Sequence, residues 1–581
     1  MTEKQLLLGN EAVARGLWEA GCRFVSSYPG TPSTEITEAA AEYAEIDAEW
    51  APNEKVAMEA ALGAAFAGAR SFCGMKHVGL NVAADPLFTA SYTGVNAGMV
   101  VAVADDPGMH SSQNEQDSRH YARAAKLMML EPSDSGECRE YAKLAFELSE
   151  RFDAPVILRL STRVSHSRSL TPPEERAERE LRPYAKDPVK YVMMPAMARV
   201  RHEVVEQRLK DQRVWAETSP LNHAEYNDKK IGVIGAGINY QYAKEALGAR
   251  ASYFKLGCVY PLPERALREF CAACETIYVA EDLDPFIEEY CKALGLDVHG
   301  KDVFPLCGEF SQNLIRKAIL GEEPPKQAPV ADAAMPGRPP VLCPGCPHRG
   351  LFYALKKCGV FVSGDIGCYT LGALKPIEMI DTCVCMGASV SALHGHNKAD
   401  PANAARSVAV IGDSTFAHSG ITGLVNIAYN RSNSVVIILD NSITGMTGHQ
   451  QNPTTGVTLK GDPTAAVNLE ALCAAVGIPR VVVVDPNDLA ATEMAVREAL
   501  DAGVPSVIIA RRPCALLKSV KAKPALRVNE NCTGCRQCMR IGCPAISMRA
   551  GEDGKKKANV NPTLCVGCGV CTQMCKFGAL A

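Results

Sequence analysis

The sequence predicts an α/β protein of several domains that ends in a small cysteine-rich domain. Its 581 residues exceed what a single hydrophobic core usually covers. Apolar, β-branched runs alternate with helix-like segments, as expected for buried parallel strands, at residues 231–234, 407–411, 434–439, 480–484 and 506–510. The last 50 residues, 532–581, instead hold eight cysteines at short, regular intervals.

The composition excludes several classes of protein. Hydrophobic residues at 47% and charged residues at 22% are typical of a globular protein, and a net charge of −4 provides no basic field for nucleic acid. The apolar run Leu6, Leu7, Leu8 is too short for a signal peptide, and no apolar stretch reaches membrane-spanning length. We therefore expect a cytoplasmic protein, in which 24 cysteines indicate metal ligation rather than disulfides.

The cysteine-rich tail predicts two 4Fe-4S clusters. Two triplets with C-x-x-C-x-x-C spacing are each followed by a further cysteine. Paired structural zinc sites are the alternative, but this triplet is not a zinc-finger spacing. In bacterial ferredoxins the fourth cysteine of each run ligates the other cluster. By that rule one cluster takes Cys532, Cys535, Cys538 and Cys575, and the second takes Cys543, Cys565, Cys568 and Cys571.

The first cysteine run departs from the usual ferredoxin pattern. Four residues, rather than three, separate Cys538 from Cys543, and Lys576 stands where a second proline is usual. We expect the longer spacing to alter cluster geometry or reduction potential.

Two segments have the composition of linkers. Residues 321–340 are rich in proline and alanine, and residues 518–524 contain several lysines. A charged stretch at residues 170–230 precedes a further strand-like run. The chain is therefore predicted to have four domains, at residues 1–200, 225–320, 341–517 and 525–581.

Polar residues follow two strands of the third predicted domain, at the carboxyl edge where open sheets bind ligands. Gly412-Asp413-Ser414 ends one strand, and the run DNSITG at residues 440–445 follows the next, with Asp413 and Asn441 28 positions apart. Magnesium on a diphosphate needs hard oxygen ligands in near-octahedral geometry. The pattern resembles the thiamine-diphosphate motif. Two ordinary strand-to-helix turns are the alternative.

This resemblance implies a role for each motif residue. Asp413, Asn441 and the Ile443 carbonyl would bind Mg²⁺. The residues implied to contact the diphosphate are Gly367, Gly412, Ser414, Thr415, Thr444 and Gly445. Ser414 replaces a glycine of the usual motif and leaves less room for backbone approach, and Asp440 replaces the first asparagine of an Asn-Asn pair.

Four cysteines outside the tail flank this motif. Cys343 and Cys346 form a CPGC run, Cys368 ends a GDIGC run, and Cys514 follows a proline. They resemble the ligands of the proximal 4Fe-4S cluster in 2-oxoacid:ferredoxin oxidoreductases, where such cysteines converge beside the thiazolium ring. The resemblance implies a third cluster. Alternatively, Cys368 and Cys514 are small buried hydrophobic residues.

Residues 28–35 (YPGTPSTE) form a turn and a helix N-cap by local criteria, with Thr31 or Ser33 as the capping residue. They also resemble the substrate loop of the same oxidoreductases. On that resemblance, the Thr31 hydroxyl contacts the carboxylate of the 2-oxoacid.

Asn53 is predicted to cap an alanine-rich helix that begins with Glu54. In thiamine enzymes a glutamate on such a helix protonates the cofactor pyrimidine, which makes Glu54 a catalytic candidate. Glu59 lies about 140° around the helix and cannot face the same ring. His418 is a further catalytic candidate, with a satisfied core histidine as its alternative.

The second predicted domain begins with a glycine pair, Gly235 and Gly237, that is typical of nucleotide binding. Tyr240 stands where the third glycine is needed, so we interpret the pair as a tight turn. Together with residues 257–263, this domain resembles the transketolase C-terminal-like domain of the same enzymes.

The resemblance implies two thiamine-diphosphate-type doubly wound domains, a transketolase C-terminal-like α/β domain and a two-cluster ferredoxin-like α+β domain. This order resembles the alpha subunits of indolepyruvate-type 2-oxoacid:ferredoxin oxidoreductases. It implies oxidative decarboxylation of aryl pyruvates (indolepyruvate, phenylpyruvate, 4-hydroxyphenylpyruvate) with coenzyme A to aryl-acetyl-CoA and CO2. It also implies a smaller beta subunit in an α2β2 assembly, and ferredoxin as electron acceptor.

Other functions stay open on the sequence. The chain is alternatively another 2-oxoacid:ferredoxin oxidoreductase, or a non-oxidative thiamine-dependent decarboxylase. A third alternative is an electron-transfer subunit that has lost its thiamine cofactor, and Ser414 in the motif makes this conceivable.

Overall fold

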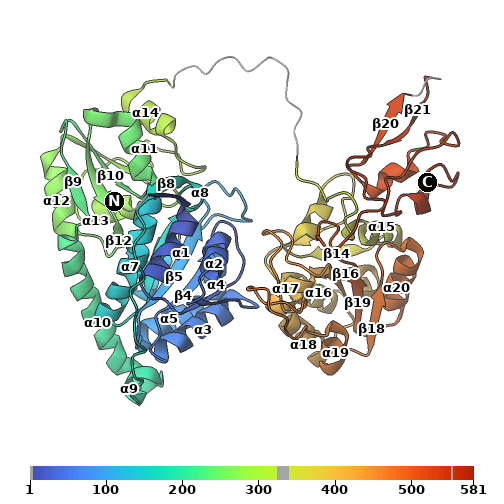
Figure 1. Cartoon of the computed structure of the whole chain (residues 1–581), viewed down its shortest axis with the longest axis horizontal. Helices are drawn as coiled ribbons and strands as arrows, with labels where there is room; N and C mark the ends of the chain where they lie inside the picture. The colour runs from blue at the N-terminus through green and yellow to red at the C-terminus, as the bar shows by residue number, and fades with distance from the viewer. Residues whose placement is uncertain (1–3, 324–338, 551–553) are drawn as a thin grey trace. The chain divides into compact units, whose positions relative to one another are not determined.

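The computed structural model describes residues 4–323, 339–550 and 554–581 (Figure 1). They form two compact units, Met1–Asp332 and Ala333–Ala581. The predicted linker at residues 321–340 lies mostly outside the described residues.

The first unit is built on a seven-stranded sheet in the order β12-β6-β7-β5-β4-β2-β3. Its strands are parallel except β12, which runs antiparallel to β6. Every residue of β5 and β7 is buried, which explains their apolar sequences. The strands are β2 (Phe24–Ser27), β3 (Asp47–Trp50), β4 (Ser71–Lys76), β5 (Met99–Asp105), β6 (Met129–Leu130), β7 (Val156–Ser161) and β12 (Cys258–Tyr260).

Helices connect the strands of this sheet, and a two-stranded ribbon accompanies them. The helices are α1 (Gly9–Glu19), α2 (Thr34–Ala41), α3 (Glu54–Phe66), α4 (His77–Val82), α5 (Ala84–Thr93), α6 (Arg119–Ala125), α7 (Ser135–Phe152) and α8 (Thr162–His166). The ribbon pairs β1 (Gln5–Leu8) with β8 (Arg168–Thr171). The predicted cap of α3 is confirmed, because the Asn53 side chain accepts a hydrogen bond of 2.9 Å from the Val56 amide.

A second sheet of the first unit has the order β13-β10-β11-β9. Its strands are β9 (His223–Glu225), β10 (Ile231–Ala236), β11 (Ser252–Leu256) and β13 (Thr276–Ala280), and its helices are α11 (Gly237–Leu247), α12 (Glu264–Ala273), α13 (Phe286–Ala293) and α14 (Gln312–Leu320). The predicted tight turn is confirmed, since Gly237 joins β10 to α11 with a φ of +49°. A Cβ atom there would lie 2.4 Å from Oε1 of Glu131.

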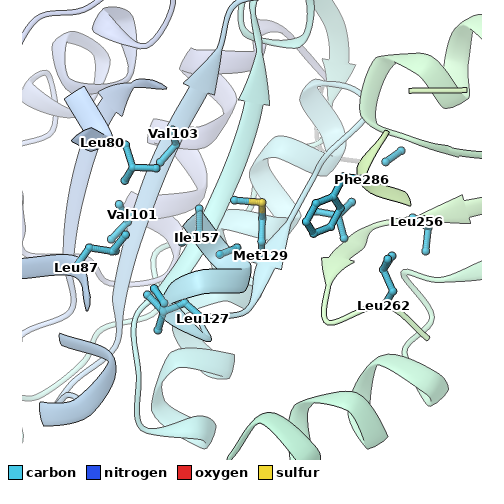
Figure 2. Close-up of a cluster of buried hydrophobic side chains, with 14 of the residues drawn as sticks. Leu80, Leu87, Val101, Val103, Leu127, Met129, Ile157, Leu256, Leu262 and Phe286 are labelled. Carbon is cyan, nitrogen blue, oxygen red and sulfur yellow. The ribbon is translucent and has the colours of Figure 1, made fainter. Parts of the chain in front are cut away.

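The two sheets of the first unit share one hydrophobic core (Figure 2). Leu256, Leu262 and Phe286 belong to the same cluster as Met129 and Ile157, the latter two from the larger sheet. The charged stretch predicted to separate the two domains contains the helices α9 (Pro188–Tyr191) and α10 (Pro195–Thr218). The predicted division between residues 1–200 and 225–320 thus corresponds to two sheets around a common core.

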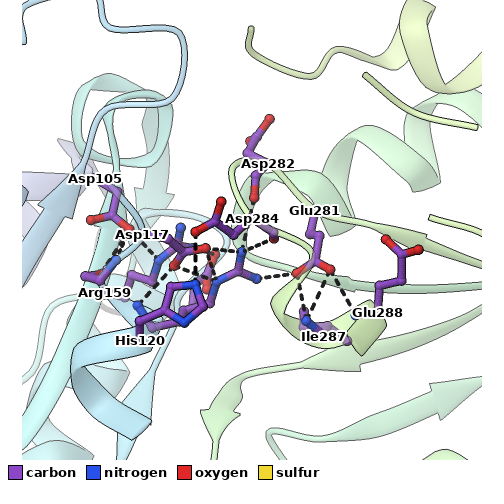
Figure 3. Close-up of polar contacts among 12 residues, drawn as sticks. Asp105, Asp117, His120, Arg159, Glu281, Asp282, Asp284, Ile287 and Glu288 are labelled. Atoms are coloured by element: carbon purple, nitrogen blue, oxygen red, sulfur yellow. Dashed lines mark hydrogen bonds and ion pairs between the residues drawn. The ribbon is translucent and has the colours of Figure 1, made fainter. Parts of the chain in front are cut away.

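Buried ion pairs also connect these two sheets (Figure 3). Arg119 donates to Asp117 and, at 2.5 Å, to Glu281, which follows β13. Its guanidinium also donates to the main-chain oxygens of Asp282 and Asp284. Arg119 and its two carboxylate partners have side chains at most 4% exposed. The three charged groups therefore interact with one another in place of water.

The second unit contains a parallel six-stranded sheet in the order β15-β14-β16-β17-β19-β18. The four apolar runs predicted as strands in this part are confirmed as β16 (Ser407–Gly412), β17 (Val435–Asp440), β18 (Arg480–Val484) and β19 (Ser506–Arg511). The other strands are β14 (Phe361–Gly364) and β15 (Thr382–Cys383). Its helices are α15 (His348–Cys358), α16 (Ala388–Ala399), α17 (Asp413–Thr415), α18 (Ile421–Tyr429), α19 (Leu469–Ala475) and α20 (Leu489–Asp501).

The cysteine-rich tail is a small module with a hairpin of β20 (Ile546–Ala550) and β21 (Lys556–Val560). One short 3-10 turn, Gln537–Ile541, contains the last cysteine of the first triplet, and another, Thr572–Met574, follows the second triplet. The module is attached to α20, because Gln573 donates to the Asn487 carbonyl (2.6 Å) and accepts from the Leu489 amide (3.1 Å). Within the described ranges no helix has the length and apolarity to cross a membrane.

Candidate functional site

Three polar groups of the thiamine-type motif converge where β16 and β17 end. One terminal atom of the Asn441 amide lies 2.7 Å from the Ile443 carbonyl oxygen and 3.2 Å from Oδ1 of Asp413. As Nδ2 this atom donates to both; as Oδ1 it completes a set of three oxygens that a bound cation would hold together. Octahedral Mg²⁺ with oxygens at 2.0–2.1 Å places neighbouring ligands about 2.9 Å apart. The donor set therefore fits Mg²⁺.

Asp413 is buried, with 2% of its surface exposed. Burial and the neighbouring Asp440 carboxylate raise the pKa of Asp413 to about 7. Its carboxylate accepts hydrogen bonds from the Ser414 amide (2.9 Å) and the Thr454 hydroxyl (3.1 Å). A cation beside this group would stabilise its charged form, which the protein environment alone disfavours.

Thr454 is not among the residues that the sequence predicted for this site. It comes from the loop after β17, where Asn452 accepts hydrogen bonds from both the amide and the hydroxyl of Thr454. This Asn-Pro-Thr turn is the only local signal that would have drawn attention to it.

Asp440, which replaces an asparagine of the usual motif, has its own partner. Arg511 on β19 donates to it at 2.6 Å and also forms two hydrogen bonds of 2.7 Å with Glu470. The extra negative charge of the Asn-to-Asp departure is thus compensated by an ion pair.

The residues predicted to contact the diphosphate surround the same turn. The Thr444 hydroxyl donates to Oγ of Ser414 at 3.0 Å, and the Thr415 hydroxyl donates to the Ile366 carbonyl at 3.0 Å. At Gly367 and Gly412 an added Cβ would lie 2.4 and 2.8 Å from the buried ring of Tyr369. Both glycines therefore make room for Tyr369, and their approach to a diphosphate stays a prediction.

His418 lies in a π-helical turn, Phe416–Gly420, between α17 and α18. Its side chain is buried, and Nδ1 lies 2.9 Å from Oγ of Ser419, which donates to the Met386 carbonyl. The contacts are those of a satisfied core histidine. The catalytic role of His418 stays a prediction.

The four cysteines that flank the motif converge on one another. The thiol of Cys343 acts electrostatically on those of Cys346, Cys368 and Cys514, and Cys368 and Cys514 also interact. Burial raises the pKa of Cys346 to about 12 and that of Cys368 to about 11. Four neighbouring thiols of this kind become thiolates together only around bound cations, as in a 4Fe-4S cluster.

This cysteine group adjoins the motif itself. The Cys514 amide donates to the Asn441 carbonyl at 2.9 Å. A Cβ on Gly445 would lie 3.4 Å from Sγ of Cys368, so the turn passes close to that thiol. The predicted Mg²⁺ ligands and the predicted proximal-cluster ligands thus occupy one place in the fold.

The tail cysteines fall into two neighbourhoods. A cavity is lined by Cys532, Cys535, Cys538 and Cys575. The thiols that act most strongly on Cys571 are those of Cys568, Cys543 and Cys565, in that order, ahead of Cys538. Backbone amides donate to two of the sulfurs, from Ala558 to Cys532 and from Ala579 to Cys575.

In the first unit, Glu54 begins α3 and is 4% exposed. Its carboxyl group lies against α4, where a Cβ on Gly79 would be 2.5 Å from Oε1 of Glu54. Glu59 instead pairs with Lys55 and is half-exposed. The two glutamates therefore face different surroundings, as the helical spacing predicted.

The Thr31 loop contacts a second loop at the same sheet edge. The Ser111 hydroxyl donates to the Thr31 carbonyl at 3.2 Å, and the ammonium of Lys76 donates to the Ser111 carbonyl at 3.0 Å. Ser33 occupies the N-cap position of α2, but its hydroxyl donates to the Gly30 carbonyl. The predicted side-chain cap is therefore wrong, because the tight turn takes the hydroxyl for itself.

Lys76 is the residue that sequence reasoning missed here. It ends β4, its stem packs against Gly30, and no carboxylate lies within ion-pair distance of its ammonium in the part of the chain that the structure describes. Burial lowers the pKa of Lys76, while the charges of Asp106 and Glu54 oppose that shift. No spacing or motif marks a lysine at a strand end.

Comparison with known proteins gives three family matches. Residues 15–231 match the thiamine-diphosphate-binding domain of pyruvate flavodoxin/ferredoxin oxidoreductases, and residues 365–510 match the C-terminal TPP-binding domain of thiamine pyrophosphate enzymes. Residues 531–579 match the 4Fe-4S dicluster domain. Fold and site thus define a thiamine-diphosphate-dependent 2-oxoacid:ferredoxin oxidoreductase with iron–sulfur clusters.

The indolepyruvate oxidoreductase subunit IorA of Pyrococcus horikoshii is 41% identical to this chain, over 99% of it and 96% of the relative. The IorA of Thermococcus kodakarensis is 42% identical, over 99% and 97%. The chain belongs to the family of these IorA subunits. A solved 2-oxoglutarate:ferredoxin oxidoreductase from Magnetococcus marinus is 18% identical, with a TM-score of 0.48 over 55% of this chain and 65% of that one.

Proposed function

We propose that this chain catalyses the oxidative decarboxylation of aryl pyruvates with coenzyme A, forming aryl-acetyl-CoA and CO2. The observation that carries the proposal is the contact between the motif and the four cysteines around it, through Asn441 and Cys514 and through Gly445 and Cys368. A cluster held by these cysteines would lie beside the cofactor and could accept electrons from it. A non-oxidative decarboxylase needs no such electron acceptor. The preference for aryl substrates is supported by the names of the relatives alone.

Asp413, Asn441 and the Ile443 carbonyl would hold Mg²⁺, and the Ser414 hydroxyl would donate to the diphosphate with Thr444 beside it. Thiamine diphosphate, when bound, supplies the electron sink for decarboxylation. The Ser414 oxygen accepts a hydrogen bond of 3.0 Å from the Thr444 hydroxyl, which orients the Ser414 hydroxyl as a donor. Ser414, which replaces the usual glycine, would therefore donate a hydrogen bond to the diphosphate. In this proposal it does not indicate that the cofactor has been lost.

Glu54 would exchange a proton with the pyrimidine ring of the cofactor, at N1′. Its burial favours this role, because a carboxyl group shielded from water is free to act on a ring placed beside it. Thr31 and Lys76 would bind the carboxylate of the 2-oxoacid, since Lys76 is a half-buried cation without an anionic partner among the described residues. The carboxylate would complete that ion pair.

Electrons would pass through the clusters to ferredoxin, and a smaller beta subunit would complete an α2β2 assembly. The test is an anaerobic assay of the chain with that subunit, using coenzyme A, a viologen dye, and indolepyruvate, phenylpyruvate, pyruvate or 2-oxoglutarate. We expect dye reduction that is fastest with the aryl pyruvates and that requires coenzyme A.

Each alternative has its own outcome in this assay. Aldehyde and CO2 without dye reduction would identify a non-oxidative decarboxylase. Faster dye reduction with pyruvate or 2-oxoglutarate would identify another member of the oxidoreductase class. Purified protein without bound thiamine diphosphate and without turnover would indicate an electron-transfer subunit.

A further inference from the structure

Arg349 is a buried cation whose side chain has no carboxylate partner in the described part of the chain. It lies in α15, three residues after Cys346, and is 4% exposed. Its guanidinium donates to main-chain carbonyl oxygens only, those of Leu342, Cys343, Ile541 and Gly542. Among the residues described, no aspartate or glutamate lies within ion-pair distance. A buried positive charge with neutral partners needs a counter-charge nearby.

Arg349 interacts electrostatically with cysteine thiols from two different predicted ligand sets. The four thiols are those of Cys543, Cys346, Cys343 and Cys568, in order of influence. Cys343 and Cys346 are predicted ligands of the proximal cluster. Cys543 and Cys568 are predicted ligands of the second tail cluster. Arg349 therefore lies between two sets of iron ligands.

The loops that carry these ligands touch each other. A Cβ on Gly345, in the CPGC run, would lie 2.2 Å from Cγ2 of Val566, which lies between Cys565 and Cys568. The Gly345 amide also hydrogen-bonds to the Cys543 thiol. No comparable contact joins the CPGC run to Cys532, Cys535 or Cys538 in the described residues.

The longer spacing of the first cysteine run contributes to this contact. Ile541 and Gly542, two of the four residues between Cys538 and Cys543, supply the carbonyls that accept from Arg349. Gly542 has a φ of +68°, and a Cβ there would lie 3.3 Å from Nη1 of Arg349. The departure from the usual ferredoxin spacing thus places carbonyl oxygens around the guanidinium.

We infer that Arg349 is the shared counter-ion of the proximal cluster and of the tail cluster held by Cys543, Cys565, Cys568 and Cys571. The inference rests on the proximal cluster of the proposed function. Each cluster gains one negative charge when it takes an electron, so a fixed buried cation between them raises both reduction potentials. Arg349 acts on electron transfer through the potentials of these two clusters. The third cluster, held by Cys532, Cys535, Cys538 and Cys575, would pass the electrons to ferredoxin.

The experiment compares the wild-type holoenzyme with Arg349→Met and Arg349→Gln, prepared anaerobically with the partner subunit. Arg497→Met is the matched control, since Arg497 is an exposed arginine of the same unit. The readouts are iron content and a redox titration followed by electron paramagnetic resonance. In both Arg349 variants we expect two of three cluster potentials to fall, each by at least a tenfold change in the one-electron equilibrium, about 59 mV. The third should not move.

Wild-type iron content is measured first. If it accounts for two clusters only, the proposed proximal cluster fails, and this outcome is separate from a failure of Arg349. Unchanged potentials in a fully loaded Arg349 variant would overturn the inference. If both variants load poorly, loss of iron from two clusters with the third retained supports a shared counter-ion, whereas loss of all three contradicts it.

Discussion

Asp413 and Lys76 are buried or half-buried charged residues whose surroundings leave part of their charge unbalanced. Asp413 has a carboxylate whose pKa is raised by burial and by Asp440, and Lys76 has an ammonium that contacts a carbonyl. A folded protein tolerates such groups when a ligand completes them. Both residues lie at carboxyl ends of parallel strands, where open sheets bind ligands.

For Asp413 we expect Asp413→Asn to weaken the binding of thiamine diphosphate with Mg²⁺ at least tenfold, or about 1.4 kcal/mol. The amide removes a charged ligand but keeps the shape of the side chain. Calorimetric titration of cofactor-free protein with Mg²⁺ and thiamine diphosphate measures the effect. The control is Asp462→Asn, an exposed aspartate of the same domain. Equal affinity of wild type and Asp413→Asn would remove Asp413 from the metal site.

Lys76→Met is expected to raise KM for the 2-oxoacid at least about tenfold, because it removes the proposed ion pair with the carboxylate. Bound thiamine diphosphate should be unchanged. The matching aldehyde, which reaches the same oxidation level by losing a proton in place of CO2, has no carboxylate and should be oxidised as by wild type. Lys55→Met, at a half-exposed lysine that pairs with Glu59, is the control. A loss that is equal for acid and aldehyde would assign Lys76 a structural role.

At the scale of elements, the close packing of α3 and α4 determines where Glu54 lies. Gly79 in α4 has the Glu54 carboxyl group in the space of its missing Cβ, whereas Gly63 in α3 has no atom within 4 Å of that position. The two helical glycines therefore have different reasons to be glycine. Gly79 leaves room for the Glu54 side chain, whereas Gly63 only weakens its helix.

Gly79→Ala should consequently lower kcat at least about tenfold while the iron–sulfur clusters stay intact, since a 2.5 Å contact forces Glu54 to move. Gly63→Ala should leave activity unchanged and stabilise the protein by about 0.5–1 kcal/mol. Steady-state kinetics and thermal melting of both variants check this pair. Full activity in Gly79→Ala would argue against Glu54 as the proton donor.

At the scale of the whole molecule, buried charge also joins parts that are distant in the chain. Arg119 connects Asp117 to Glu281 and so ties the seven-stranded sheet to the four-stranded sheet in the first unit (Figure 3). Burial alone would raise the pKa of Asp117, but the Arg119 guanidinium overcomes this and lowers it to about 2. The ion pair is therefore formed at all pH values at which the enzyme would work.

This shift predicts how stability changes in acid. The pKa of Asp117 is lower in the folded protein than in the unfolded chain, where it is about 3.9. Its contribution, on the order of 2–3 kcal/mol, is complete above that value and is lost as pH falls toward 2. The difference in melting temperature between wild type and Asp117→Asn should shrink over this range. Asp85→Asn, at an exposed aspartate, should show no such trend.

Much of the fold and part of the site followed from the sequence, because the signals involved are local. The apolar runs of β16, β17, β18 and β19 and the cap at Asn53 depend on neighbouring residues. The tail cysteines are also marked by short, regular spacing, and a 4Fe-4S dicluster domain spans them. Cysteine spacing of this kind can be recognised without knowing how the rest of the chain folds.

The tertiary structure alone decided which buried charges meet. Arg349 and Gly542 are 193 residues apart, and Arg119 and Glu281 are 162 apart. It also added β12 to the first sheet and so merged two predicted domains around one core. Local sequence encodes the preference of a segment for helix, strand or turn. It does not encode which distant segment will exclude water from a given charge. That packing leaves Lys76 and Arg349 shielded from water and in need of a negatively charged partner.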